Sequence, residues 1–161
     1  MRNEGEINRA LELYADTIRR ICFIHLKNHA DVEDVFQDVF LKYLLYERSF
    51  DNDIHEKAWL IRVATNACRD VLKSFSRRNV TAFDELYKEP FYLQEEESEV
   101  LETVLKLPEK YRNVIYLYYY EGYSAVEIAM ILEKKENTIY TWLDRARKKM
   151  KDYLGGESVE E

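Results

Sequence analysis

The sequence predicts an all-α protein made of two small helical domains joined by an acidic linker. Composition is the first reason: the 161 residues include only 4 Gly and 2 Pro, while 47% are hydrophobic and 34% charged. This mixture is typical of soluble helices around a core. Apolar residues also recur at helical spacing on both sides of residues 79–100, and no period is sustained within that segment.

The first predicted domain, residues 1–78, contains three helices. Apolar residues at helical spacing predict the first, with Ile7, Leu11, Tyr14, Ile18, Ile21 and His25 on one face. Asp31 is the expected N-cap of the second helix, whose apolar stripe is Val32, Val35, Phe36, Val39, Phe40, Tyr43 and Leu44. A loop follows around "ERSFDNDIH", and the third helix is expected from about residue 56 to residue 78.

Residues 79–104 form the predicted linker and hold the whole charge excess of the chain. They contain eight acidic residues and one basic residue, a net charge of −7 that equals the charge of the full sequence. Residues 59–78 carry a net charge of +4, and residues 134–151 carry +5. The acidic average therefore hides two basic segments, one in each predicted domain.

The second predicted domain, residues 105–154, ends in a helix-turn-helix pattern. Pro108 suits the first turn of a helix that runs to about residue 121 and stops at Gly122. Ser124 and Glu127 then form a capping box at the start of a short helix. A second, basic helix has an apolar seam at Ile139, Leu143, Ala146 and Met150. Two short helices with a basic second one favour DNA binding, although an amphipathic hairpin with a solvated charged face fits the same pattern. Residues 155–161 form an acidic tail.

The third helix carries a stripe of basic and polar residues that faces away from its apolar side. At 100° per residue the stripe contains Trp59, Arg62, Asn66, Arg69, Lys73 and Arg77. A solvated helix usually intersperses acids for pairing at i,i+4, and this stripe has none. The pattern favours contact with nucleic acid over a plain solvent face, and Trp59 fits the core equally well.

Four segments in order resemble the extracytoplasmic-function sigma factors of bacterial RNA polymerase, from about residue 13 to residue 154. They are "DVEDVFQDVFLK", "KAWLIRVATNACRDVLKSFSRR", "LPEKYRNVIYLYYYEGYSAVEIAMIL" and "TIYTWLDRARKKM". The resemblance implies a σ2 domain that melts the −10 promoter element and a σ4 domain that reads the −35 element. It also implies that the partners are core RNA polymerase (through its β′ clamp helices and β flap), promoter DNA and, in some family members, an anti-sigma factor. The N-terminal residues lack the apolar core of a secretory signal, so a cytoplasmic location is the default expectation, and no catalytic motif predicts an enzyme.

The resemblance also assigns residues to these partners. Asp34, Gln37, Asp38 and Leu41 match the positions that bind core polymerase, and Asn66 matches the position that holds a flipped base. Loop residues 50–56 are expected to complete the base pocket. Tyr140, Thr141, Asp144 and Arg145 match −35-reading positions, with Arg147 and Lys148 near phosphates.

The family pattern is not followed throughout the second domain. Glu133, Lys134 and Lys135 stand where the family usually has Gly, an apolar residue and Pro, so an altered turn is expected. Tyr140 and Trp142 replace residues that are usually basic.

The remaining features argue against other functional classes. His25 and His29 are spaced like helical metal ligands but lack a suitably placed acid, and Cys22 and Cys68 are expected to be reduced core residues. We expect no metal, cofactor, catalytic site, secretory signal or membrane-spanning segment. Two alternatives stay open: a helix-turn-helix regulator that binds duplex DNA by itself, and a sigma-like adaptor that binds polymerase without melting DNA.

Overall fold

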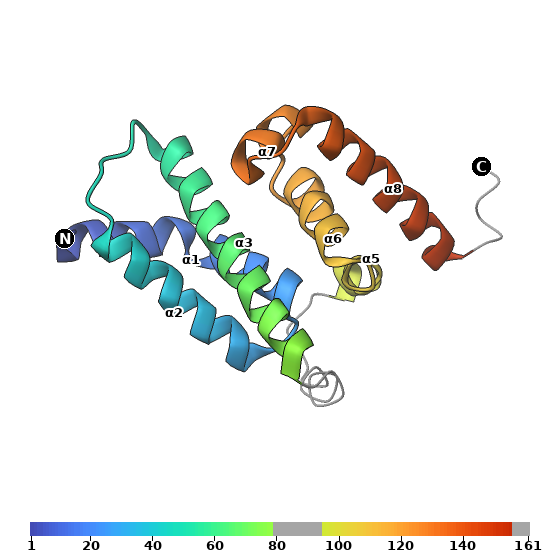
Figure 1. Ribbon diagram of the computed structural model, residues 1–161, viewed down its shortest axis with the longest axis horizontal. Helices are drawn as coiled ribbons and strands as arrows, with labels where there is room; N and C mark the ends of the chain where they lie inside the picture. The colour runs from blue at the N-terminus through green and yellow to red at the C-terminus, as the bar shows by residue number, and fades with distance from the viewer. Residues whose placement is uncertain (79–94, 156–161) are drawn as a thin grey trace. The chain divides into compact units, whose positions relative to one another are not determined.

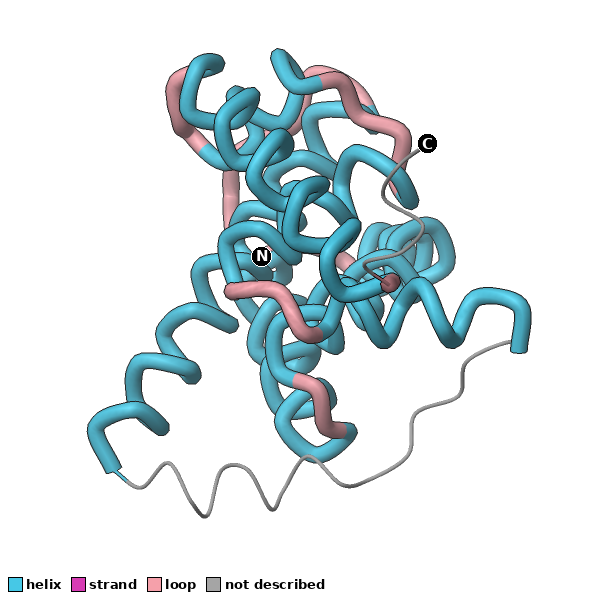
Figure 2. Tube along the Cα trace, turned by 90° about the vertical axis from the view of Figure 1, so that its right-hand side faces the viewer, coloured by secondary structure: helices cyan, strands magenta, loops and turns pink. Residues whose placement is uncertain are grey.

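The structure is a computed structural model that describes residues 1–78 and 95–155, with side chains over 1–74 and 99–155. The chain divides into two compact units, Met1–Phe91 and Tyr92–Glu161. Regular secondary structure in the described residues is helical (Figure 2). The predicted all-α, two-domain class is therefore confirmed. Residues 79–94 of the predicted linker and residues 156–161 of the predicted tail lie outside the described residues.

The first unit is a bundle of three helices, α1 (Glu4–Leu26), α2 (His29–Leu45) and α3 (Asp53–Arg78) (Figure 1). Each helix contacts the other two. The predicted apolar stripes meet in its core, where fully buried residues include Ile18, Ile21, Cys22, Val39, Tyr43, Leu60, Ile61, Ala64 and Cys68. Both cysteines are free thiols, as the sequence predicted.

The starts of α2 and α3 differ from the sequence prediction. Asn28, not Asp31, is the N-cap of α2, because its side-chain oxygen accepts a hydrogen bond from the Asp31 backbone N–H at 2.9 Å. The prediction of an Asp31 cap was wrong because Asn is an equally good cap and lies one turn earlier. Helix α3 starts at Asp53, where Asn52 accepts from the His55 backbone N–H at 2.9 Å.

The second unit consists of α5 (Glu95–Leu105), α6 (Glu109–Ile115), the π-helical segment η1 (Tyr116–Tyr120), α7 (Ala125–Leu132) and α8 (Glu136–Leu154). Helix α8 contacts α5, α6 and α7. The core includes Val104, Val114, Ile115, Leu117, Ile128, Ile139, Leu143 and Ala146. Because α5 begins at Glu95, it occupies the end of the range predicted to be linker.

The helix expected to run from Pro108 to about residue 121 changes its winding part-way. It is α-helical over Glu109–Ile115 and π-helical over Tyr116–Tyr120, and Gly122 follows with a φ of 79°. A π-helical turn is wider than an α-helical one, and apolar periodicity alone does not reveal it. Within this segment, the Tyr119 hydroxyl accepts a hydrogen bond from Arg147 of α8.

The helix-turn-helix motif is formed by α7, a short turn and α8. The predicted capping box is confirmed, because Ser124 Oγ accepts from the Glu127 N–H at 3.1 Å and Glu127 Oε1 accepts from the Ser124 N–H at 2.8 Å. Glu133 adopts a left-handed conformation, with φ 58° and ψ 48°. The expectation of an altered turn was wrong: Glu133 takes the conformation that usually favours glycine.

Candidate nucleic-acid and protein interfaces

One face of α2 is exposed and combines acidic, amide and apolar groups. All four residues predicted to bind polymerase lie on it: Asp34, Gln37, Asp38 and Leu41 are exposed, while Val35, Phe36, Val39 and Phe40 on the other side are buried. Asp38 forms an i,i+4 ion pair with Lys42 at 3.4 Å. We refer to these four residues together with Leu45 as the α2 docking face.

Leu45 is a member of this face that the sequence reasoning missed. It is 57% exposed and follows Leu41, which is 51% exposed, by one helical turn. Two exposed leucines at i,i+4 form an apolar strip beside the carboxylates. The i,i+4 spacing of the two leucines could be seen in the sequence. The end of α2 could not be predicted from the sequence, and it decides whether Leu45 is still helical.

The predicted stripe on α3 lies on the outer side of the bundle. Asn66 and Lys73 are exposed, and Arg62 and Arg69 are half-buried, whereas Leu60, Ala64 and Ala67 on the inner side are buried. The side chain of Arg77, the last predicted member, lies outside the described residues. The described part of the stripe therefore presents cations and one amide without an intervening acid.

Trp59 belongs to an aromatic cluster that joins the beginning of α3 to the loop before it. The centroid of its ring system lies 4.5 Å from that of Tyr46 and 5.6 Å from that of Phe50. Trp59 is half-buried, so it packs against this cluster while part of its side chain stays accessible. The cluster links the stripe on α3 to loop residues 46–52.

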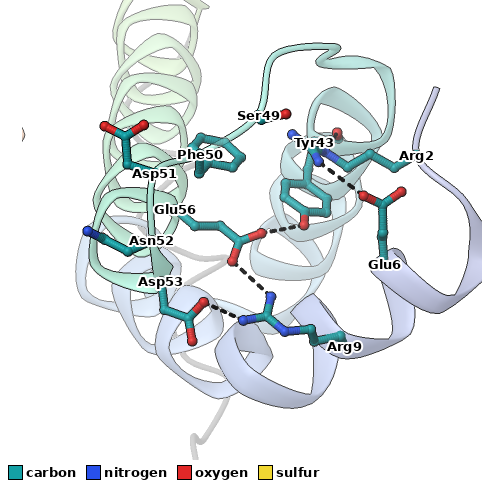
Figure 3. A pocket seen from close by; sticks show the side chains of 10 residues that line it. All are labelled: Arg2, Glu6, Arg9, Tyr43, Ser49, Phe50, Asp51, Asn52, Asp53 and Glu56. Atoms are coloured by element: carbon teal, nitrogen blue, oxygen red, sulfur yellow. Dashed lines mark hydrogen bonds and ion pairs between the residues drawn. The ribbon is translucent and has the colours of Figure 1, made fainter.

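The loop borders a polar pocket of about 350 Å³, shown in Figure 3. Glu56 lies at its base and its side chain is 7% exposed. Its carboxylate accepts hydrogen bonds from Tyr43 Oη at 2.5 Å, Arg9 Nη1 at 3.0 Å and Tyr14 Oη at 3.1 Å. One buried carboxylate thus joins α1, α2 and α3, and its three donors compensate for its desolvation.

The Glu56 network perturbs the acid–base properties of its partners. Burial, followed by the hydrogen bond to Glu56, raises the pKa of Tyr43 to about 12. Burial, followed by the charge of Glu56, also raises the pKa of Tyr14 above its ordinary value. Hydrogen bonds to Glu56 and Asp53 raise the pKa of Arg9. Sequence reasoning placed Glu56 only as an uncertain loop residue, since Glu is rarely buried and its partners lie far away in the chain.

The outer face of α8 carries most of the residues predicted to read DNA. Thr141, Arg145 and Lys148 are exposed opposite the buried residues Ile139, Leu143 and Ala146. Asp144 is exposed beside them and pairs with Lys148 at 3.3 Å, and Tyr140 is 54% exposed. Five of the six predicted residues thus lie on accessible parts of α8 without a described contact to η1.

Arg147, the sixth, is turned toward the π-helical tyrosines. Its Nε donates a hydrogen bond to Tyr119 Oη at 2.8 Å, and its guanidinium carbon lies 5.4 Å from the centroid of the Tyr118 ring. It also borders an apolar groove of about 430 Å³ between α5, η1 and α8. The structure does not bring Arg147 together with Thr141 and Arg145, because it lies roughly 120° around the helix from Thr141.

Metal-ligand clusters and membrane-spanning helices are both absent from the described residues. Within residues 1–78 and 95–155, no three His, Cys, Asp or Glu side chains gather in a way that would hold a metal ion. In the same part of the chain, no helix combines the length and apolar character needed to cross a bilayer.

Comparison with known proteins gives the family of both units. Residues 10–78 match the model of sigma-70 region 2, and residues 97–150 match the model of sigma-70 region 4. The ECF RNA polymerase sigma-E factor of Escherichia coli K12 is 31% identical, over 73% of this chain and 70% of that protein. The chain belongs to the extracytoplasmic-function sigma factors.

Two further comparisons support this sigma factor assignment over nearly the full length. The ECF sigma factor SigW of Bacillus subtilis is 27% identical over 89% of this chain and 86% of its own. The solved structure of CnrH in complex with the cytosolic domain of CnrY has a TM-score of 0.69 and 26% identity, over 94% of this chain and 89% of that one. As a sigma factor, the protein binds core RNA polymerase and promoter DNA, directs promoter recognition and is not an enzyme.

Proposed function

We propose that the two units divide promoter recognition between them: unit one docks on core polymerase and opens the −10 element, and unit two reads the −35 element. One observation carries this proposal. The first bundle presents two separate outer surfaces, the α2 docking face and the α3 stripe, so polymerase and DNA contact different helices. A helix-turn-helix regulator has no need of either surface, and an adaptor that does not melt DNA has no need of the second.

The docking step uses the mixed character of α2. Asp34 and Asp38 complement a basic partner surface such as the polymerase β′ clamp helices, and Leu41 and Leu45 supply apolar contact area. Docking through one exposed helix face leaves the core of the bundle undisturbed.

The opening step uses α3 and the aromatic cluster beside it. Arg62, Arg69 and Lys73 neutralise phosphates of the DNA strand, while the Asn66 amide hydrogen-bonds to the edge of an unstacked base. Unstacking one base costs only a few kcal/mol, which such contacts offset. Trp59 extends this surface toward the loop.

The second unit supplies the duplex contact. Thr141, Asp144, Arg145 and Lys148 face the −35 major groove, with Tyr140 at one edge. Arg147 has two possible roles in this complex. If its hydrogen bond to Tyr119 breaks, Arg147 contacts a DNA phosphate; if the hydrogen bond persists, Arg147 remains part of the wall of the apolar groove. We assign that groove to the polymerase β flap, because its walls include Val104, Ile115 and Leu154.

The proposed domain limits are residues 1–78 for the σ2 part, 79–104 for the linker, 105–154 for the σ4 part and 155–161 for the tail. Promoter recognition takes place in the cytoplasm, where bacterial RNA polymerase and promoter DNA are located, so we propose a cytoplasmic location for this protein. The sigma factor RpoE of Bartonella quintana, whose structure has the same fold (TM-score 0.76, 22% identity), was solved with the anti-sigma factor NepR, so an anti-sigma factor is a further proposed partner.

Run-off transcription with purified bacterial core polymerase and genomic fragments tests the proposal. The wild-type protein is expected to yield discrete transcripts that core enzyme alone does not make. Asp38→Arg is expected to lose most of this activity and to weaken core binding in a pull-down, because it places a cation against a basic surface. Glu12→Arg, an exposed charge reversal on α1, is the matched control and is expected to behave as wild type. Normal core binding by Asp38→Arg would contradict the docking assignment.

A further inference from the structure

Arg2 lies before the region-2 match, which begins at residue 10, and yet it is tied closely to the end of α2. Its side chain is only 11% exposed. Nε donates a hydrogen bond to the Tyr43 carbonyl at 3.0 Å, and the Arg2 backbone N–H donates to the Leu44 carbonyl at 3.0 Å. The last carbonyls of a helix have no partner within the helix, and Arg2 donates to two of them; the Tyr43 carbonyl also accepts from the Tyr46 N–H at 3.3 Å.

The same side chain also holds the loop that follows α2. Nη2 donates to the Arg48 carbonyl at 2.7 Å. The guanidinium carbon lies 4.4 Å from the centroid of the Tyr43 ring and 5.1 Å from that of Phe50 (Figure 3). Glu6 completes the arrangement with an ion pair at 3.7 Å. A planar guanidinium with several donors is suited to holding carbonyls and aromatic rings together.

The loop is therefore fixed at both of its ends. Arg2 holds its first half, and the buried Glu56 network holds the helix that follows it. Between them, Phe50 packs against Tyr46 and Trp59 at centroid distances of 5.5 Å and 5.6 Å. Removing the Arg2 side chain releases the carbonyl of Arg48 and uncovers part of the Phe50 and Tyr43 rings, whereas the hydrogen bonds of Glu56 to Tyr43, Arg9 and Tyr14 do not involve Arg2.

We propose that Arg2 is a positioning residue for promoter opening: it pre-forms loop 46–52 so that the loop and Asn66 can hold an unstacked −10 base. This rests on the proposed function of the first unit. A loop that is already ordered loses little conformational entropy when the base binds, whereas a loose loop must be ordered at that moment. Arg2 acts through the loop and need not touch DNA.

The first part of the test uses the free protein and does not depend on any DNA activity. Amide hydrogen exchange of residues 46–52 is measured in wild type, Arg2→Ala, Arg2→Lys and the control Arg20→Ala, an exposed arginine on α1. Loss of charge-assisted hydrogen bonds in Arg2→Ala is expected to speed exchange in the loop roughly tenfold. Arg2→Lys keeps the charge but not the planar set of several donors, so the exchange rate of its loop is expected to lie between those of wild type and Arg2→Ala. The exchange rate in Arg20→Ala is expected to match wild type.

The second part measures open complexes with holoenzyme on a duplex promoter. Arg2→Ala is expected to reduce open-complex formation several-fold, with partial rescue in Arg2→Lys, while core affinity and closed-complex formation stay at wild-type levels. A merely structural role would lower thermal stability, core affinity and closed complexes together. Unchanged loop exchange, or a loosened loop with normal opening, would overturn the inference. If the wild-type protein itself opens no promoter with core enzyme, the proposed function fails, and the inference fails with it even if exchange changes as expected.

Discussion

Replacing Glu133 with glycine should stabilise the second unit, although it removes a side chain from the helix-turn-helix motif. Glu133 occupies the left-handed position after α7, where the Lys134 N–H donates to the Ala129 carbonyl at 2.9 Å. A residue with a Cβ costs about 1–2 kcal/mol in this conformation. Glycine avoids that cost but loses about 0.5–1 kcal/mol of chain entropy on folding. The net gain is therefore about 0–1.5 kcal/mol, and its midpoint of about 0.75 kcal/mol corresponds to roughly 3–6 °C in melting temperature for a unit of this size.

Scanning calorimetry of the full chain measures this shift, and three further variants control it. Glu133→Ala keeps the Cβ and loses the rest of the side chain, so it is the reference for the glycine variant. Glu133→Asn should lie between Ala and Gly, and Glu133→Val should be the least stable. Since Glu133 is exposed, none of these changes leaves a cavity. A glycine variant no more stable than the alanine variant would refute the reasoning, because the left-handed strain would then be absent from the protein.

Two other predictions concern the first unit. Asn66→Ala should lose a base contact of about 1–3 kcal/mol. Permanganate footprinting of this variant should therefore show fewer open complexes on a duplex promoter, while closed complexes stay nearly normal. A pre-melted bubble promoter should partly restore open complexes. If the bubble restores none of the defect while the duplex promoter still opens, the proposed base contact of Asn66 is contradicted. The raised pKa of Tyr43 predicts stability that is fully present below pH 10 and is lost as pH rises toward about 12, because the unfolded state releases the proton first. Denaturant titrations of wild type and Tyr43→Phe across this range should show a shallower pH slope in the variant, and identical slopes would contradict a raised pKa of Tyr43.

Features that depend on local sequence could be predicted before the structure was known. The apolar stripes, the Ser124–Glu127 capping box and the exposed sides of α2 and α8 each follow from spacing within one or two helical turns. The start of α2 was misplaced because Asn28 and Asp31 are both good caps. The exposure of the predicted site residues could be predicted in the same way, because the side of a helix on which each residue lies follows from the spacing within that helix.

Features that depend on tertiary contacts were not predictable. Glu56 is buried only because Tyr14, Tyr43 and Arg9 reach it from other helices, and a sequence pattern treats it as a surface acid. Arg2 contacts carbonyls more than forty positions away in the chain. The π-helical winding of η1, whose Tyr119 hydroxyl accepts a hydrogen bond from Arg147, has no signature in apolar periodicity. These contacts order the loop and the groove beside the predicted sites.

The most direct test of the central claim compares promoter binding by the isolated protein and by its complex with core polymerase. The chain carries a net charge of −7, and its basic segments 59–78 and 134–151 each offer only a few net charges for phosphate neutralisation. A mobility-shift titration near physiological salt should show weak, salt-labile binding by the protein alone. Adding core polymerase, which fixes both units and supplies its own DNA contacts, should give tight, sequence-specific binding. Nanomolar, sequence-specific binding without core polymerase would contradict this account.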